Sequence, residues 1–107
     1  GEWGEPGGDL ATMAINYLLW SLYGHNRLNG PFRTLYNAYF EEYFAATGDT
    51  EVLEVMAPFF VFRGLVIASP EWYPDHPEKV RRRLFNLLTN VLEDDVFDWA
   101  NINKYLE

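Results

Sequence analysis

The chain of 107 residues carries eight lysine or arginine residues against 16 aspartate or glutamate residues, and it contains no cysteine. Its formal net charge of −8 argues against nucleic acid and against an anionic membrane surface as partners, because both require a basic surface. The charge suits a cationic partner or substrate, although solubility alone would also account for it. The absence of cysteine excludes disulfides and thiolate chemistry.

Size and hydrophobicity indicate one globular domain. A chain of this length suffices for a single domain, and 49% of its residues are apolar and 18% aromatic, which is not the composition of a disordered chain. Such a chain can hold more apolar surface than it can bury, and the excess would cover a neighbour or a ligand. The longest apolar run, 55–68, is too short and too interrupted to span a bilayer. No signal peptide is visible, so we expect a cytoplasmic protein.

The beginning of the chain predicts a loop followed by a central helix. Residues 1–8 hold four glycines and a proline and are expected to form the loop. Asp9 then suits the N-cap of a helix over 10–23, which Gly24 ends. This helix is apolar on nearly every side, and such helices normally lie in the middle of a fold.

A second helix is predicted from Pro31, which suits a first turn, to Gly48. Its apolar residues recur at helical spacing and form an aromatic stripe. We expect the stripe to be core, with a stacking platform for a ligand ring as the alternative. The stripe consists of Phe32, Leu35, Tyr36, Tyr39, Phe40, Tyr43 and Phe44.

Asp49 or Thr50 is expected to cap a third helix that runs to about Ser69 with a kink at Pro58. An irregular connector over 69–76 follows, because three prolines interrupt it. Pro77 then starts a fourth helix, and Asp98 caps a short last helix that ends at Leu106. The fourth helix has a predicted buried stripe of Val80, Leu84, Leu87, Leu88, Val91 and Leu92.

No strand pattern is present, so the sequence predicts an all-α fold of about five helices. Arg63 lies among apolar neighbours, and a buried guanidinium needs a partner. We expect a structural ion pair that joins two helices, with a substrate-side or phosphate-side arginine as the alternative. The basic run Lys79, Arg81, Arg82 and Arg83 is expected to be a solvated or interdomain salt-bridge face. His25 and His76 stand alone, without the spacing of metal ligands.

Three segments resemble the aminoglycoside phosphotransferase-like (choline kinase-like) family. In the first, the turn Gly4-Glu5-Pro6 is followed by Asp9-Leu10-Ala11 at the start of an apolar helix. In the second, 62–74, an arginine-containing helix leads into a Ser-Pro…Tyr-Pro turn with an adjacent tryptophan. The third, 97–106, is similar to the C-terminal helix of the family. The resemblance extends from Gly4 to Leu106 and departs from the family at Gly8, where a bulkier apolar residue is usual.

The resemblance implies that residues 1–107 are the C-terminal helical subdomain of a protein kinase-like fold. The parent would transfer the γ-phosphoryl group of ATP to a hydroxyl group of a small substrate. Residues 1–8 would be the loop that follows the metal-binding motif, and Asp9 would organise the catalytic loop by accepting hydrogen bonds from its backbone. The chain itself contains no glycine-rich phosphate loop and no His-x-Asp catalytic loop, so we expect no catalytic residue and no metal ligand in it. ATP and magnesium would bind the parent, whose N-terminal ATP-binding portion would be a partner of this chain.

In this family, carboxylates on the helical subdomain bind cationic amines of the substrate. The carboxylates that would do so are Glu41, Glu42, Glu71 and Asp75, with scattered surface acids as the alternative reading. The other candidate substrate-side residues, from the segment 62–74, are Arg63, Trp72 and Tyr73. A second function remains open from the residues alone. The chain could be a freestanding acidic helical module that binds a protein partner through its aromatic surface.

Overall fold

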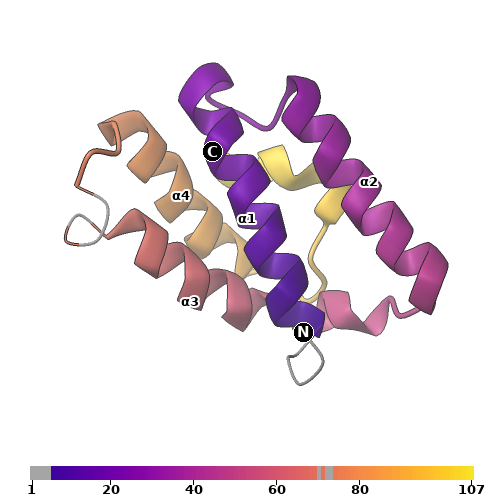
Figure 1. The fold of residues 1–107 in the computed structure, drawn as a ribbon. Coiled ribbons are helices and arrows are strands. Elements are labelled where there is room, and N and C mark those ends of the chain that lie inside the picture. Colours follow the sequence, from indigo (N-terminus) through magenta and orange to yellow (C-terminus); the bar gives the residue numbers. More distant parts are fainter. Residues whose placement is uncertain (1–5, 70, 72–73) are drawn as a thin grey trace.

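The computed structural model describes residues 6–69, 71 and 74–107, which form four α-helices and two 3₁₀ helices. The helices are α1 (Pro6–His25), α2 (Gly30–Thr47), η1 (Glu51–Glu54), α3 (Met56–Ala68), α4 (Glu78–Val91) and η2 (Trp99–Leu106). No strand occurs within these described ranges, so the predicted all-α class is confirmed. In Figure 1, α1 runs through the middle of the molecule, with α2 on one side and α3 and α4 on the other.

The central helix α1 is longer at both ends than the sequence predicts. It begins at Pro6, because proline has a suitable φ and loses no hydrogen bond in a first turn. Asp9 therefore lies inside the first turn, and its predicted place at the N-cap is wrong. The helix also passes Gly24 and ends before Asn26, which adopts the left-handed conformation (φ 60°) and donates its N–H to the Leu22 carbonyl at 3.2 Å. Asparagine tolerates that conformation better than most residues.

The second helix agrees with its prediction. Pro31 lies in the first turn of α2, and Gly48 closes its end in the left-handed conformation (φ 65°). Tyr36 and Phe40, at the centre of the aromatic stripe, are fully buried, whereas Leu35 is 48% exposed. The other aromatic members are partly buried against the core, so the core interpretation is confirmed for the centre of the stripe.

The third predicted helix is divided into η1 and α3. The chain leaves the helical path at Val55 (φ −116°, ψ 4°), three residues before Pro58. Pro58 consequently falls in the first turn of α3, where its missing N–H would have had no helical partner. The predicted continuous helix with a kink at Pro58 is therefore wrong: the interruption lies at Val55, before the proline, which is tolerated in the first turn of α3.

The last part of the chain departs from prediction at Leu92 and at η2. Leu92 is 58% exposed because α4 already ends at Val91, whereas the rest of the predicted stripe is buried. η2 is a 3₁₀ helix interrupted by a non-helical residue, Asn101. Asp98 occupies its N-cap, but its carboxylate binds the Asn101 amide (3.1 Å) and the Lys104 ammonium (3.0 Å) instead of the backbone.

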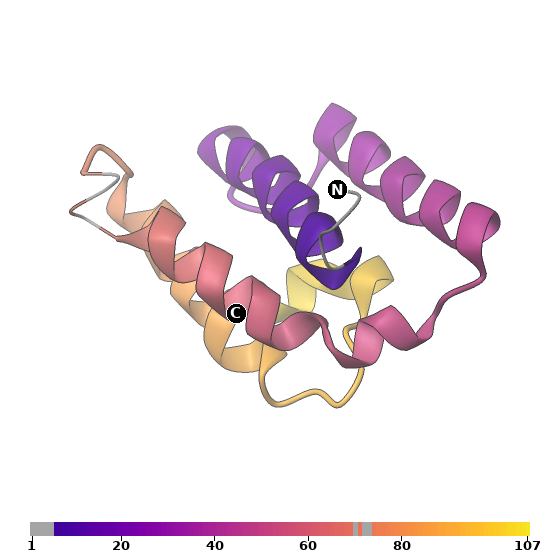
Figure 2. The ribbon, with the colours of Figure 1, turned by 60° about the horizontal axis from the view of Figure 1, so that its bottom comes forward.

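Aromatic rings from the segment after α4 join the two sides of the fold beneath α1. Phe40 of α2 stacks on Trp99 with ring centroids 5.2 Å apart, and Phe60 of α3 packs on Phe97 at 4.5 Å. The buried Tyr36 hydroxyl donates to the Trp99 carbonyl at 2.7 Å. Figure 2 shows η2 lying between α2 and the α3–α4 pair, so the end of the chain fills the space that these helices leave open.

α3 and α4 pack so closely at Gly64 that a Cβ atom there would lie 2.3 Å from Leu88 Cδ2. We predict that Gly64→Val lowers the free energy of unfolding by about 1–3 kcal/mol, because the added methyl groups displace Leu88. Urea denaturation measures the change. Gly24→Ala is the matched control: Gly24 is helical with nothing within 4 Å, so alanine should raise stability by up to about 1 kcal/mol. An unchanged free energy of unfolding in the Gly64→Val variant would contradict the close packing of α3 and α4.

Candidate functional site

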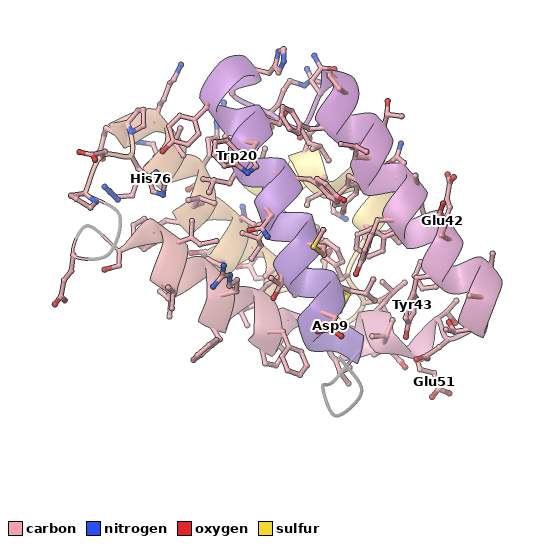
Figure 3. All side chains as sticks on the ribbon, in the orientation of Figure 1. Asp9, Trp20, Glu42, Tyr43, Glu51 and His76 are labelled. Atoms are coloured by element: carbon pink, nitrogen blue, oxygen red, sulfur yellow. The ribbon has the colours of Figure 1, made fainter. Side chains whose placement is uncertain are left out.

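One face of α1 is not covered by any other described helix. Five residues at helical spacing form it, and we call them the α1 face: Asp9, Met13, Asn16, Trp20 and Tyr23. Trp20 is 61% exposed and Tyr23 is 40% exposed. Figure 3 shows Asp9 and Trp20 along the front of α1, where no ribbon passes over them. The expected central position of this helix is therefore correct for its other sides and wrong for this one.

The flank of the α1 face toward α2 is aromatic. The rings of Tyr17 and Tyr39 meet edge to face with centroids 6.4 Å apart. Burial, followed by the nearby Asp9 carboxylate and Tyr17, raises the pKa of Tyr39. Further along α2, the Tyr43 hydroxyl donates to Asp49 Oδ2 at 3.1 Å. This flank thus presents phenol rings within electrostatic reach of a carboxylate at the start of α1.

The flank toward α3 contains Arg63. Helical periodicity places Arg63 on the same side of α3 as Phe59, whose ring would lie 3.4 Å from a Cβ atom on Gly8. The side chain is half-buried and its Nε is fully enclosed, yet within the described part of the chain it has no hydrogen bond or ion pair. The described residues therefore supply no partner for the predicted structural ion pair, and an enclosed donor without an acceptor is unfavourable by about 1–3 kcal/mol.

The C-terminal end of the α1 face is bound to the connector between α3 and α4. The Tyr23 hydroxyl and His76 Nδ1 form a hydrogen bond, and their ring centroids lie 5.6 Å apart. Burial of the imidazole, followed by the positive charge of Arg81, lowers the pKa of His76. His76 therefore has a structural role at this position, which its isolation in the sequence did not indicate.

The predicted substrate-side carboxylates do not converge. Glu41 and Glu42 are exposed on α2, whereas Glu71 and Asp75 are exposed on the connector. Figure 1 shows α2 and the connector on opposite sides of α1. Trp72 and Tyr73, which were predicted to belong to the same set, lie outside the described residues.

The α1 face and its flanks offer groups for binding. They include one carboxylate, one arginine whose enclosed Nε has no acceptor among the described residues, and several aromatic rings. Among the residues that the structure describes, no group of three or more histidine, cysteine, aspartate or glutamate side chains could hold a metal ion. None of the described helices combines the length and the apolar character needed to cross a bilayer.

Comparison with protein-family models, with curated proteins and with solved structures finds no significant match for this chain. Sequence reasoning also missed a second concentration of charge, at the other end of α1. Arg27 and Arg33 meet Lys104 there around a common hollow. Lys104 is about 70 positions away from both arginines, so no local motif could reveal their meeting; only packing of η2 against the α1–α2 turn brings them together.

We predict that the free energy of unfolding falls as the pH decreases through about 6.5, the value at which histidine in an unfolded chain takes up a proton. The folded state keeps His76 neutral to a lower pH, so unfolding binds a proton in this window. Urea denaturation at fixed ionic strength from pH 7 to pH 5 should show a smaller fall for His76→Asn than for the natural chain. An NMR titration that gave His76 a pKa at or above the ordinary value would contradict the prediction.

Proposed function

We propose that this chain is the acceptor-side helical part of a small-molecule phosphotransferase of the aminoglycoside phosphotransferase-like type. The parent would transfer the γ-phosphoryl group of ATP to a hydroxyl group of a small, cationic substrate in the cytoplasm. The observation that carries the proposal is the uncovered α1 face. A predominantly apolar helix that packs against α2, α3, α4 and η1 leaves one side, including a largely exposed Trp20, without a covering layer among the residues that the structure describes.

Arg63 supports the same conclusion. Folded proteins rarely enclose an arginine nitrogen without an acceptor, because the desolvated donor is not compensated. Arg63 borders the α1 face, so an acceptor that approached this face from outside the described residues would reach it. A carboxylate of the covering layer or a phosphate of the bound nucleotide would both suit a guanidinium.

Asp9 is the second supporting residue. Its carboxylate is exposed at the first turn of α1, on the same face as Trp20. A carboxylate there can accept backbone N–H groups of a loop that packs over the helix, and such charge-assisted hydrogen bonds are strong. Asp9 is thus proposed as a positioning residue that holds the catalytic loop, without transferring a proton itself.

Phosphoryl transfer requires ATP, magnesium and the acceptor hydroxyl to be held together. The described residues offer no metal-binding group, so we assign ATP and magnesium to the proposed N-terminal portion. There the metal would neutralise phosphate charge during transfer. The exposed carboxylates Glu41, Glu42, Glu71 and Asp75 would contribute a negative field that attracts a cationic acceptor.

A second function, a freestanding protein-interaction module, is favoured by another apolar surface. Pro58, Phe62 and Leu65 lie at helical spacing on the outer side of α3, and Phe62 is 73% exposed. This stripe faces away from the core, because Phe60 and Ile67 on the opposite side of α3 are buried, and none of its residues belongs to the α1 face. A partner that bound only this stripe would support the module.

The test uses the polypeptide encoded by the whole reading frame that contains this chain. We expect ³¹P NMR to show ATP-dependent phosphorylation of a hydroxyl-bearing amine by that polypeptide and none by residues 1–107 alone. Asp9→Asn should lower kcat by about 10- to 100-fold, since a loop displaced by about 1 Å is enough for such a loss, with little change in KM for ATP. A reading frame that lacks a His-x-Asp-x-x-x-x-Asn motif upstream of Gly1 would overturn the proposal and favour the module.

A second prediction concerns the covering layer. In residues 1–107 alone, Trp20→Gln should change the free energy of unfolding by less than about 0.5 kcal/mol, because the ring is already exposed. In the whole polypeptide the same change should lower the Tm, because the ring would be buried there. Leu18→Ala is the control: Leu18 is fully buried, so both forms should lose about 2–5 kcal/mol. Equal tolerance of Trp20→Gln in both forms would contradict a covering layer at this face.

A further inference from the structure

The end of α1 opposite Asp9 carries a basic depression that the proposed function does not use. A first hollow of about 390 Å³ and a second of about 300 Å³ adjoin each other and share Arg27, Asn103 and Lys104. Arg33 completes the first hollow and Arg83 the second. The walls come from the turn between α1 and α2 and from η2, so the depression exists only in the folded chain.

The depression is lined by basic side chains, although the protein as a whole is acidic. The chain has only eight lysine and arginine residues and a net charge of −8, yet four of the eight basic residues line the two hollows. The described residues that line the first hollow include no carboxylate. An anion that would be repelled by most of this surface therefore meets guanidinium groups at this place.

The basic side chains differ in how far they are already engaged. Lys104 is ion-paired with Asp94 (3.3 Å) and Asp98 (3.0 Å), so its charge is largely compensated. A terminal N–H group of Arg33 donates a hydrogen bond to the Ala100 carbonyl, and the other N–H groups of the guanidinium remain available for a ligand. The side chain of Arg27 is exposed and makes no hydrogen bond or ion pair with any described residue. The two arginines of the first hollow are thus the groups that remain able to bind a ligand.

The wall that carries Arg27 is held rigidly. Ser21 Oγ donates to the Arg27 carbonyl at 2.5 Å and accepts the N–H of Asn29 at 2.9 Å. The Leu28 N–H donates to Asn103 Oδ1 at 2.8 Å, and the Asn103 amide returns a hydrogen bond to the Leu28 carbonyl at 3.1 Å. Because these bonds fix the turn before any ligand arrives, binding would not have to order the loop.

The position of Arg33 is also unusual for its helix. It lies in the first turn of α2, where the helix dipole disfavours a positive charge, and the first turn contains no acidic residue. The guanidinium lies 5.9 Å from the centre of the Tyr36 ring, which compensates part of this cost. An anion between Arg27 and Arg33 would compensate the remainder.

We propose that the first hollow binds the phosphate group of a small phosphorylated molecule, held between Arg27 and Arg33. Guanidinium groups bind phosphate through paired hydrogen bonds, and two of them that approach from different segments suit a tetrahedral group better than one planar carboxylate. The volume lies within the range of small-molecule sites. Asp9 and Arg27 are separated by most of α1, roughly 25 Å at 1.5 Å per residue, and no residue of the α1 face lines the first hollow, so the proposal does not depend on the proposed function.

The test is an NMR titration of residues 1–107 with inorganic phosphate at about pH 8 and constant ionic strength. We expect saturable shifts of the backbone amides of 27–29 and 101–104 and of the Arg27 and Arg33 side-chain signals, with a Kd in the low millimolar range. Arg27→Gln should weaken binding at least about fivefold, and the double variant with Arg33→Gln should abolish it. The Arg27 side chain makes no hydrogen bond or ion pair with a described residue, so its variant should keep the natural circular dichroism spectrum.

Arg82→Gln is the matched control, because it removes the same charge from an exposed position of α4 outside both hollows. It should change the Kd by less than about twofold. A loss equal to that of Arg27→Gln would show that only net charge matters and would overturn the proposal. Absence of saturation up to about 50 mM phosphate, or tighter binding of citrate than of phosphate and glycerol phosphate, would overturn it as well.

Discussion

The fold depends on the one-sided burial of α1. Leu10, Ile15, Leu18 and Leu22 project from α1 into the core and are no more than 1% exposed. α2 packs against one side of this helix and the α3–α4 pair against the other. Since the side chains opposite the core receive no covering helix, the same geometry that builds the domain leaves Trp20 and Asp9 at its surface.

The two sides joined by α1 need a second connection, which the end of the chain supplies. Phe97 packs on Phe60 of α3 and Trp99 stacks on Phe40 of α2, so the segment after α4 completes the core. The same segment carries Asn103, which fixes the turn at the end of α1. Packing of this segment therefore both closes the core and forms the basic hollow, which gives the two ends of α1 different chemical character.

Helix centres could be predicted because apolar residues recur at helical spacing, as in the stripe of α2 and in Val80 to Val91 of α4. Helix ends could not be predicted as well, because several residues compete for the same role. α1 ends before Asn26 and not at Gly24. Pro58 lies in the first turn of α3, although it was expected to kink the middle of a longer helix. Of the candidate site, Asp9 and Arg63 were singled out from local pattern, but the absence of a partner for Arg63 depends on which segments pack around it.

The sequence by itself determined the helical class, the order of the helices and the centres of the buried stripes of α2 and α4, because these properties depend on residues within one or two turns of each other. Only the tertiary structure decided that no described helix covers one face of α1, that Arg63 finds no acceptor among the described residues, and that η2 packs beside Arg27 and Arg33. Each of these depends on contacts between distant segments, whose approach is set by packing and not by local spacing.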